Sequence, residues 1–96
     1  MTEREIQKQI IDVCRASNYR VFRMNAGMGK RGQHLAPPGT PDLLVIGFNG
    51  KVTWVEVKSA DGKLNADQET MHGELRFRGQ KVVVARGIED LPWLKS

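Results

Sequence analysis

The pair Asn49-Gly50, set between two apolar runs, constrains the fold of this chain more than any other feature. The runs Leu43 to Ile46 and Val52 to Val57 are rich in β-branched residues, and Asn-Gly between such runs is a strong hairpin signal. Both faces of each run are apolar, which is typical of strands in the middle of a sheet covered on both sides. The sequence therefore predicts an antiparallel hairpin inside a layered α/β fold.

Further elements are expected on either side of this hairpin. Thr2 and Glu5 have the spacing of a capping box, and apolar residues follow at helical spacing, so a helix is predicted to about Ser17. The other expected elements are a strand over Val21–Asn25, a helix from the cap Asn65 to about Arg78, a strand over Val82–Ala85 and a short helix over Ile88–Leu94. The 96 residues are thus predicted to form one domain of order α-β-β-β-α-β-α, with a mixed four-stranded sheet flanked by helices.

Positive charge is distributed unevenly along the chain. The net charge is only +4, but the stretches between Asp12 and Asp42 and from Leu75 to Ile88 contain no acidic residue. They contain Arg15, Arg20, Arg23, Lys30, Arg31, Arg76, Arg78, Lys81 and Arg86. Two basic zones in a small domain suggest a polyanion as partner, because neutralised phosphates release counterions. The alternative is an ordinary solvated basic surface.

Two simpler features restrict the class of protein. No stretch has the length and apolarity of a membrane span and no signal-like N-terminus is visible, so we expect a cytoplasmic protein that does not act at a membrane. Cys14 is the single cysteine and sits at an apolar helical position, so we expect a small core residue. One cysteine excludes an internal disulfide and a thiolate metal cluster.

Charged residues stand where the two hairpin strands begin and end. Asp42 precedes the first apolar run, and Glu56-Val57-Lys58 closes the second. Residues two apart in a strand point to the same side, so Glu56 and Lys58 share a face while Val57 enters the core. Two carboxylates held close together repel unless a cation lies between them, and Mg²⁺ prefers oxygen ligands. The pattern predicts a divalent metal site.

The length of the hairpin loop tests this hypothesis. A two-residue Asn49-Gly50 turn would pair Asp42 with Val57, and Asp42 and Glu56 would then lie on opposite faces. A three-residue loop from Phe48 to Gly50, with Gly50 in the left-handed conformation, would place Asp42 directly across from Glu56. We predict the three-residue loop, or an equivalent bulge nearer Asp42.

Three motifs together carry a family resemblance. Gly39-Thr40-Pro41-Asp42 is followed fourteen residues later by Glu56-Val57-Lys58 and then by Leu64-Asn65-Ala66-Asp67-Gln68, and this combination resembles the VRR-NUC family of the PD-(D/E)XK nuclease superfamily. The similarity runs over essentially the whole chain. It implies a restriction-endonuclease-like fold and a Mg²⁺-dependent DNA endonuclease in which Mn²⁺ can substitute. It also implies a likeness to Holliday-junction resolvases, which act as homodimers on branched DNA, and a location in a bacterial or phage-infected cell.

The resemblance also implies roles for particular residues. Asp42 and Glu56 would hold the metal with the main-chain carbonyl of Val57. Lys58 would orient or help deprotonate the attacking water and stabilise the charge that builds on the phosphate.

Two further site residues each have a competing interpretation. Glu3 would complete the acidic cluster, with Glu5 as the alternative, although acids in a first helical turn also simply complement the helix dipole. Gln68 would join the site, or it would only close a capping box on Asn65.

Residues outside the acidic cluster complete the prediction. The candidates for DNA contact are Lys30, Arg31, Arg23 and His34, against the alternative of a surface loop with incidental charges. We do not expect His34 or His72 to bind the metal, since neither has a second nitrogen or sulfur donor at a suitable spacing. Trp54 and Trp93 are expected in the core or a subunit contact rather than as base-stacking platforms.

Two other functional classes compete with the nuclease. A catalytically silent DNA-binding module would keep the fold and the basic zones but has no need for the costly charge cluster of Asp42, Glu56 and Lys58. An interaction protein without a nucleic-acid partner would leave both basic zones unexplained. Salt-dependent DNA binding and metal-dependent cleavage separate the three classes.

Overall fold

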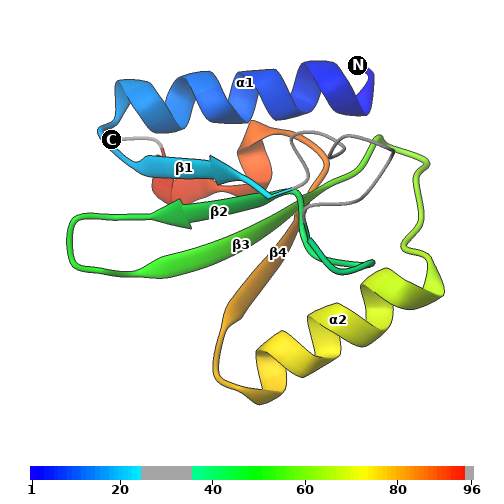
Figure 1. Cartoon of the computed structure of the whole chain (residues 1–96). Coiled ribbons are helices and arrows are strands. Elements are labelled where there is room, and N and C mark those ends of the chain that lie inside the picture. The colour runs from blue at the N-terminus through cyan, green and yellow to red at the C-terminus, as the bar shows by residue number, and fades with distance from the viewer. Residues whose placement is uncertain (25–35, 95–96) are drawn as a thin grey trace, which may run out of the picture.

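A computed structural model of the chain describes residues 1–24 and 36–94 (Figure 1). In chain order its elements are α1 (Glu3–Ala16), β1 (Arg20–Arg23), β2 (Leu43–Ile46), β3 (Val52–Val57), α2 (Ala66–Phe77), β4 (Lys81–Ala85) and the 3₁₀ turns η1 (Ile88–Asp90) and η2 (Pro92–Leu94). Within the described ranges, no helix is long and apolar enough to cross a membrane.

The strands form one mixed sheet in the order β1-β2-β3-β4. The first three strands are antiparallel, and β4 runs parallel to β3 after the crossover through α2. Figure 1 shows α1 along one face of the sheet and α2 on the other side, where it packs against β4. The predicted α/β fold with a mixed four-stranded sheet flanked by helices is therefore confirmed.

Both helices begin at the capping boxes that the sequence predicts. The Thr2 hydroxyl accepts the N–H of Glu5 at 3.1 Å, and the Glu5 carboxylate accepts the N–H of Thr2 at 2.8 Å. Asn65 and Gln68 form the same reciprocal pair at the start of α2. Each box satisfies two backbone donors that a helix start leaves without partners. The helices end where expected, before Asn18 at φ 63° and Gly79 at φ 84°.

The core lies between α1 and one face of the sheet. It contains Ile6, Ile10, Ile11, Cys14, Leu43, Val45, Val55, Val57, Ala85, Leu91 and Leu94. Alternate residues of β2 and β3 contribute to it, as the period of a strand requires. Burying one Leu or Ile side chain contributes about 1.5–3 kcal/mol, so this interface is the main source of stability. The prediction that Cys14 is a core residue is confirmed.

Three elements differ from the prediction, and the smallest difference is that β4 begins at Lys81, one residue before the expected Val82. The first strand begins at Arg20 and ends at Arg23, one residue earlier than expected at its start, and Asn25 lies outside the described residues. The closing helix over Ile88–Leu94 is wrong in type, because two 3₁₀ turns occupy this segment. Pro92 lacks an N–H and disfavours helical backbone before it, and Leu91 accordingly has φ −124° and ψ 64°.

The hairpin has the predicted three-residue loop. Leu43 pairs with Val55, and the Gly47 N–H donates to the Lys51 carbonyl at 3.0 Å, which leaves residues 48–50 as the loop. Gly50 has φ 72°, the left-handed conformation that this loop requires. One further step in this register brings residue 42 opposite residue 56, as predicted.

Candidate active site

Asp42 is held at the end of the β2–β3 ladder by its own side chain. Its Oδ2 accepts the N–H of Val57 at 2.8 Å, while its main-chain carbonyl accepts the N–H of Met24 at 2.9 Å. The next N–H along β3, that of Lys58, donates at 3.0 Å to the Ala85 carbonyl on β4. The carboxylate thus takes the place of a backbone acceptor where β2 no longer provides one, and this fixes its orientation beside β3.

Glu56 lies on the face of β3 opposite the α1 core and is only 1% exposed. Its Oε1 is 2.9 Å from Nε2 of His72, which comes from α2 and is also 1% exposed. Burial, hydrogen bonding to Asp42 and the negative charge of Asp42 together raise the pKa of Glu56 from 4.5 to about 9. Glu3 makes a smaller contribution in the same direction, and the positive charge of Lys58 acts against the rise. Without a cation, therefore, the Glu56 carboxyl keeps its proton at neutral pH.

His72 is the site residue that the sequence analysis missed. Burial lowers its pKa, and the positive charge of Arg76 lowers it further, so the imidazole is neutral in its buried position. Its Nδ1 is buried without a hydrogen-bond partner among the described residues. The available signal was the spacing from Gln68, because residues four apart share one helix face. Met71 and Leu75, the apolar residues in helical phase with Gln68, are only half-buried.

Lys58 and Glu3 meet around the turn that follows β3. A Cβ at Gly62 would lie 3.3 Å from both Glu3 Oε2 and Lys58 Cδ, so these two side chains flank this glycine. Glu3 is the first residue of α1, and it lies close enough to Glu56 to affect its pKa. The alternative residue, Glu5, is used in the capping box. The structure therefore places Glu3 and Lys58 on either side of Gly62, near the carboxyl pair, and leaves Glu5 at the helix cap. Within the described residues, Glu3 does not join Asp42 and Glu56 in a group that could hold a metal ion.

Arg86 holds this turn in place from the end of β4. Its Nη1 donates to the carbonyls of Ser59 at 2.6 Å and Gly62 at 2.7 Å. Arg76 similarly donates from α2 to the Val82 carbonyl at 3.0 Å. Two arginines of the second acid-free window thus have structural partners, which weakens the interpretation of that whole window as a surface for a polyanion.

The remaining predicted site residues have separate positions. Gln68 is half-buried, and its Oε1 accepts the Asn65 N–H at 3.0 Å, so the capping-box interpretation is the one that the structure shows. Arg23 is exposed at the end of β1, where it pairs with Leu43, the residue after Asp42. The other residues predicted to contact DNA lie outside the described residues: Lys30, Arg31 and His34.

The donor atoms at the site are oxygens. In residues 1–24 and 36–94, no group of three or more His, Cys, Asp or Glu side chains is gathered to hold a metal ion. The available set is the pair Asp42 and Glu56 with nearby main-chain oxygens. Such a set suits Mg²⁺, which binds one or two carboxylates and completes its shell with waters and substrate phosphate, and it does not suit a structural zinc ion with four protein ligands.

One solved structure gives a close match to the whole fold. A structure described as "VRR_NUC domain" has a TM-score of 0.73 to this chain and 28% sequence identity, over 98% of this chain and 95% of that chain. No family model and no curated protein matches the sequence. The structural match confirms the family resemblance and the restriction-endonuclease-like fold that the motifs predict.

Proposed function

We propose that this chain, whose structural match supports its place in the VRR-NUC family of nuclease domains, is a metal-dependent endonuclease that hydrolyses phosphodiester bonds in DNA. The observation that carries the proposal is the meeting of Asp42 and Glu56 at the end of the β2–β3 ladder, with Lys58 on the same face as Glu56. Burying a carboxyl group beside a second one is costly. A bound divalent cation would make this arrangement favourable with both carboxyl groups ionised.

Each residue has a role that its contacts support. Asp42, Glu56 and the main-chain carbonyl of Val57 would hold Mg²⁺, or Mn²⁺ in its place, and the ion would supply Lewis acidity at the phosphate. The Val57 N–H orients the Asp42 carboxylate, and His72 orients Glu56.

Lys58 is proposed to stabilise the charge on the phosphate. Its compact ammonium group stabilises the negative charge that develops during attack and orients the attacking water. Glu3, on the other side of Gly62, adds a carboxylate at the edge of the site.

We infer the path of the DNA from Arg23, which lies near Asp42, and from the basic residues that follow it in the sequence. Arg23 is exposed beside the start of β2 and is available to a phosphate. Lys30, Arg31 and His34 are proposed to contact the same backbone. Gln68 is proposed to support the site from the first turn of α2, in addition to its role in the cap.

We extend the proposal to branched DNA and to a homodimer acting in replication, repair or recombination. A 96-residue chain is too small to enclose a four-way junction alone. Two copies related by a two-fold axis would present two equivalent sites to the paired strands of a junction. Such an enzyme would act in the cytoplasm of a bacterial or phage-infected cell.

The test is cleavage of matched linear-duplex and four-way-junction DNA in Mg²⁺, Mn²⁺ or chelator, with Asp42→Asn beside the wild type. Asparagine keeps an oxygen that can accept the Val57 N–H but removes the charge, so the variant should fold. We expect metal-dependent cutting that falls by about a hundredfold or more in Asp42→Asn, beyond the 10–100-fold typical of residues outside the ligand shell.

The other outcomes separate the alternatives. Binding of DNA without cutting under every condition would identify a catalytically silent DNA-binding module. Equal cleavage rates on the junction and the duplex would support a nuclease without a preference for branched DNA. If analytical ultracentrifugation shows a monomer both with and without junction DNA, the homodimer proposal is wrong.

A further inference from the structure

A pocket of about 280 Å³ opens on the α1 face of the sheet, at the hairpin end of the strands. It is lined by Tyr19, Val45, Gly47, Lys51, Thr53, Lys81 and Trp93. Glu56 points to the opposite face of β3, three residues beyond Thr53, which corresponds to about 10 Å along a strand. The pocket is therefore separate from the site of Asp42 and Glu56.

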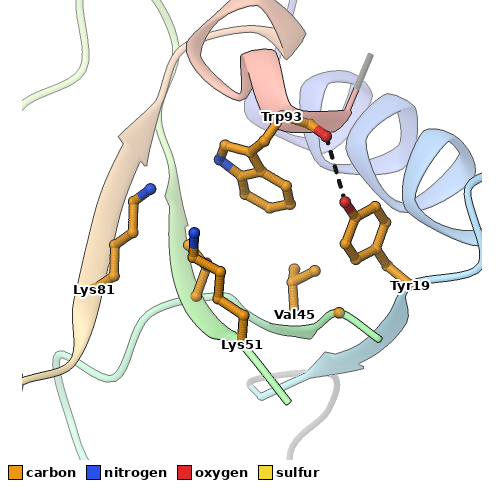
Figure 2. Close-up of a pocket in the computed structure, with 7 residues that line it drawn as sticks. Tyr19, Val45, Lys51, Lys81 and Trp93 are labelled. Carbon is orange, nitrogen blue, oxygen red and sulfur yellow. Dashed lines mark hydrogen bonds between the residues drawn. The ribbon is translucent and has the colours of Figure 1, made fainter. Parts of the chain in front are cut away.

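The aromatic wall of the pocket is built and held in place. The Tyr19 hydroxyl donates to the Trp93 carbonyl at 3.4 Å, and the two rings meet edge to face with centroids 5.5 Å apart (Figure 2). A Cβ at Gly47 would lie 2.9 Å from Tyr19 Cε1, so the absence of a side chain there gives the ring its place. Trp93 is half-buried and packs on the core, as expected for a core residue, but it also faces the pocket.

Two lysines bring positive charge to the same pocket. Thr53 pairs with Lys81 across the β3–β4 ladder, and Lys51 lies two residues before Thr53, so both lysines share its face. Such diagonal neighbours have Cα atoms about 7–8 Å apart. Figure 2 shows both ammonium groups extending toward the side of the pocket where Trp93 lies. Neither lysine forms an ion pair within the described part of the chain, where the ion pair between charged side chains is Lys8–Asp12.

Lys51 and Lys81 do not stack on the indole ring of Trp93. The cation–π contact found in the described residues is Arg20 over Phe22, so the face of Trp93 is not occupied by Lys51 or Lys81. Like charges on neighbouring strands destabilise a sheet unless they share a counter-charge. The pocket thus combines an aromatic face, a largely apolar floor and two unpaired cations, and it contains no acidic side chain.

We propose that this pocket binds one nucleotide, with its base against Trp93 and its phosphate between Lys51 and Lys81. Bases stack on aromatic side chains whatever their sequence, and lysine ammonium groups bind phosphate as point charges. The volume lies near the lower limit of ligand pockets, about 300 Å³, and therefore admits one nucleotide rather than a duplex. The nucleotide is either free or an unpaired residue of a DNA strand. The proposal depends on neither the metal nor cleavage.

The test is a titration of the ¹⁵N-labelled full chain in chelator, followed by ¹H–¹⁵N correlation spectra. With dAMP we expect shifts of the Trp93 indole N–H and of the Gly47 and Thr53 amides. The Trp54 indole serves as an internal control, because its N–H donates to Gln80 Oε1 and Trp54 is on the opposite face of β3. Deoxyadenosine and inorganic phosphate, each alone, should bind more weakly than dAMP.

Charge variants test the phosphate contact. Lys51→Gln and Lys81→Gln should each weaken dAMP binding about fivefold, the upper range for an exposed charge pair. Lys8→Gln makes the same change in net charge on α1, where Lys8 pairs with Asp12, and should leave the affinity unchanged.

The results of these titrations either support or overturn binding of a nucleotide in the pocket. The proposal is overturned if dAMP leaves the Trp93 signal unmoved, if phosphate alone binds as well as dAMP, or if Lys8→Gln weakens binding as much as the pocket variants. Shifts reproduced by a short single strand but not by a blunt duplex would support the pocket and identify an unpaired DNA residue as the ligand. Shifts produced by dAMP alone would support it with a free nucleotide as ligand.

Discussion

Replacing Glu56 with glutamine should remove much of the pH dependence of stability of the metal-free protein between pH 7 and 8.5. Burial, hydrogen bonding to Asp42 and the charge of Asp42 raise the pKa of Glu56 from 4.5 to about 9. In this range the folded chain keeps a proton on the carboxyl that the unfolded chain has released. The contribution of the protonated Glu56 carboxyl to the stability of the folded chain is therefore complete below pH 4.5 and is lost as pH rises toward 9. Glutamine stays neutral and can still hydrogen-bond to His72.

The magnitude follows from one bound proton. Stability should fall by about 1.4 kcal/mol per pH unit, or about 2 kcal/mol over this window. The window avoids two other perturbed groups. His72, whose pKa is lowered from 6.5, is largely neutral in both states above pH 7. Burial raises the pKa of the Cys14 thiol from 9.0 to about 11, so its effect on stability is small up to pH 8.5 and grows at higher pH.

The assay is urea unfolding in chelator at pH 7 and 8.5, followed by circular dichroism. The wild type should lose about 2 kcal/mol across the window and Glu56→Gln much less. Equal losses in the two proteins would show that Glu56 is ionised in the folded state, and the reasoning would fail. Saturating Mg²⁺ at pH 8.5 should stabilise the wild type more than the variant, because an ion that binds only the folded state raises its stability.

Substitutions at Asp42, at Lys58 and at two glycines separate structural from chemical roles. Asp42→Ala leaves the Val57 N–H without an acceptor and should cost about 1–3 kcal/mol in urea unfolding in chelator, whereas Asp42→Asn should cost less; equal losses would contradict the proposed ladder contact. Lys58→Ala should abolish cleavage and retain DNA binding in a gel-shift assay, and preserved cleavage would remove Lys58 from the mechanism. Gly39→Ala should lower stability by about 1–3 kcal/mol or more, because Gly39 has φ 85° and a Cβ would collide with the main chain of α2. Gly50→Ala is the control: Gly50 has φ 72° but lies in open space, so this variant should lose less stability. Thermal melts of the two variants measure the difference.

Local sequence signals were sufficient for most of the fold. Reciprocal caps located both helix starts, because Thr2 with Glu5 and Asn65 with Gln68 satisfy donors within four residues of each other. The hairpin register followed from a chemical requirement, since Asp42 lies opposite Glu56 with a three-residue loop or an equivalent bulge and not with a two-residue turn. The part of the predicted site that lies on the hairpin, Asp42 with Glu56 and Lys58, therefore came together through strand parity.

Contacts between distant elements were not accessible in the same way. The pairing of His72 with Glu56 joins a helix face to a strand face, and the weak apolar pattern of α2 did not show which side would be buried. Arg86 belonged to an acid-free window in the sequence, but its bonds to the turn after β3 depend on how β4 docks beside β3. The short helix expected over Ile88–Leu94 did not form, because the backbone of Leu91 before Pro92 is not helical.

The length of the exposed hairpin loop determines which residues face each other at the opposite end of the sheet. Phe48, Asn49 and Gly50 are all exposed, and surface loops of this kind ordinarily tolerate insertions and deletions. Here the loop must keep the parity of its length, since one residue more or fewer turns Asp42 away from Glu56 while the strands can still pair. Changes of residue type at positions 48 and 49 should thus be common among active relatives, and changes of loop length by one should occur only together with a compensating bulge elsewhere in β2 or β3.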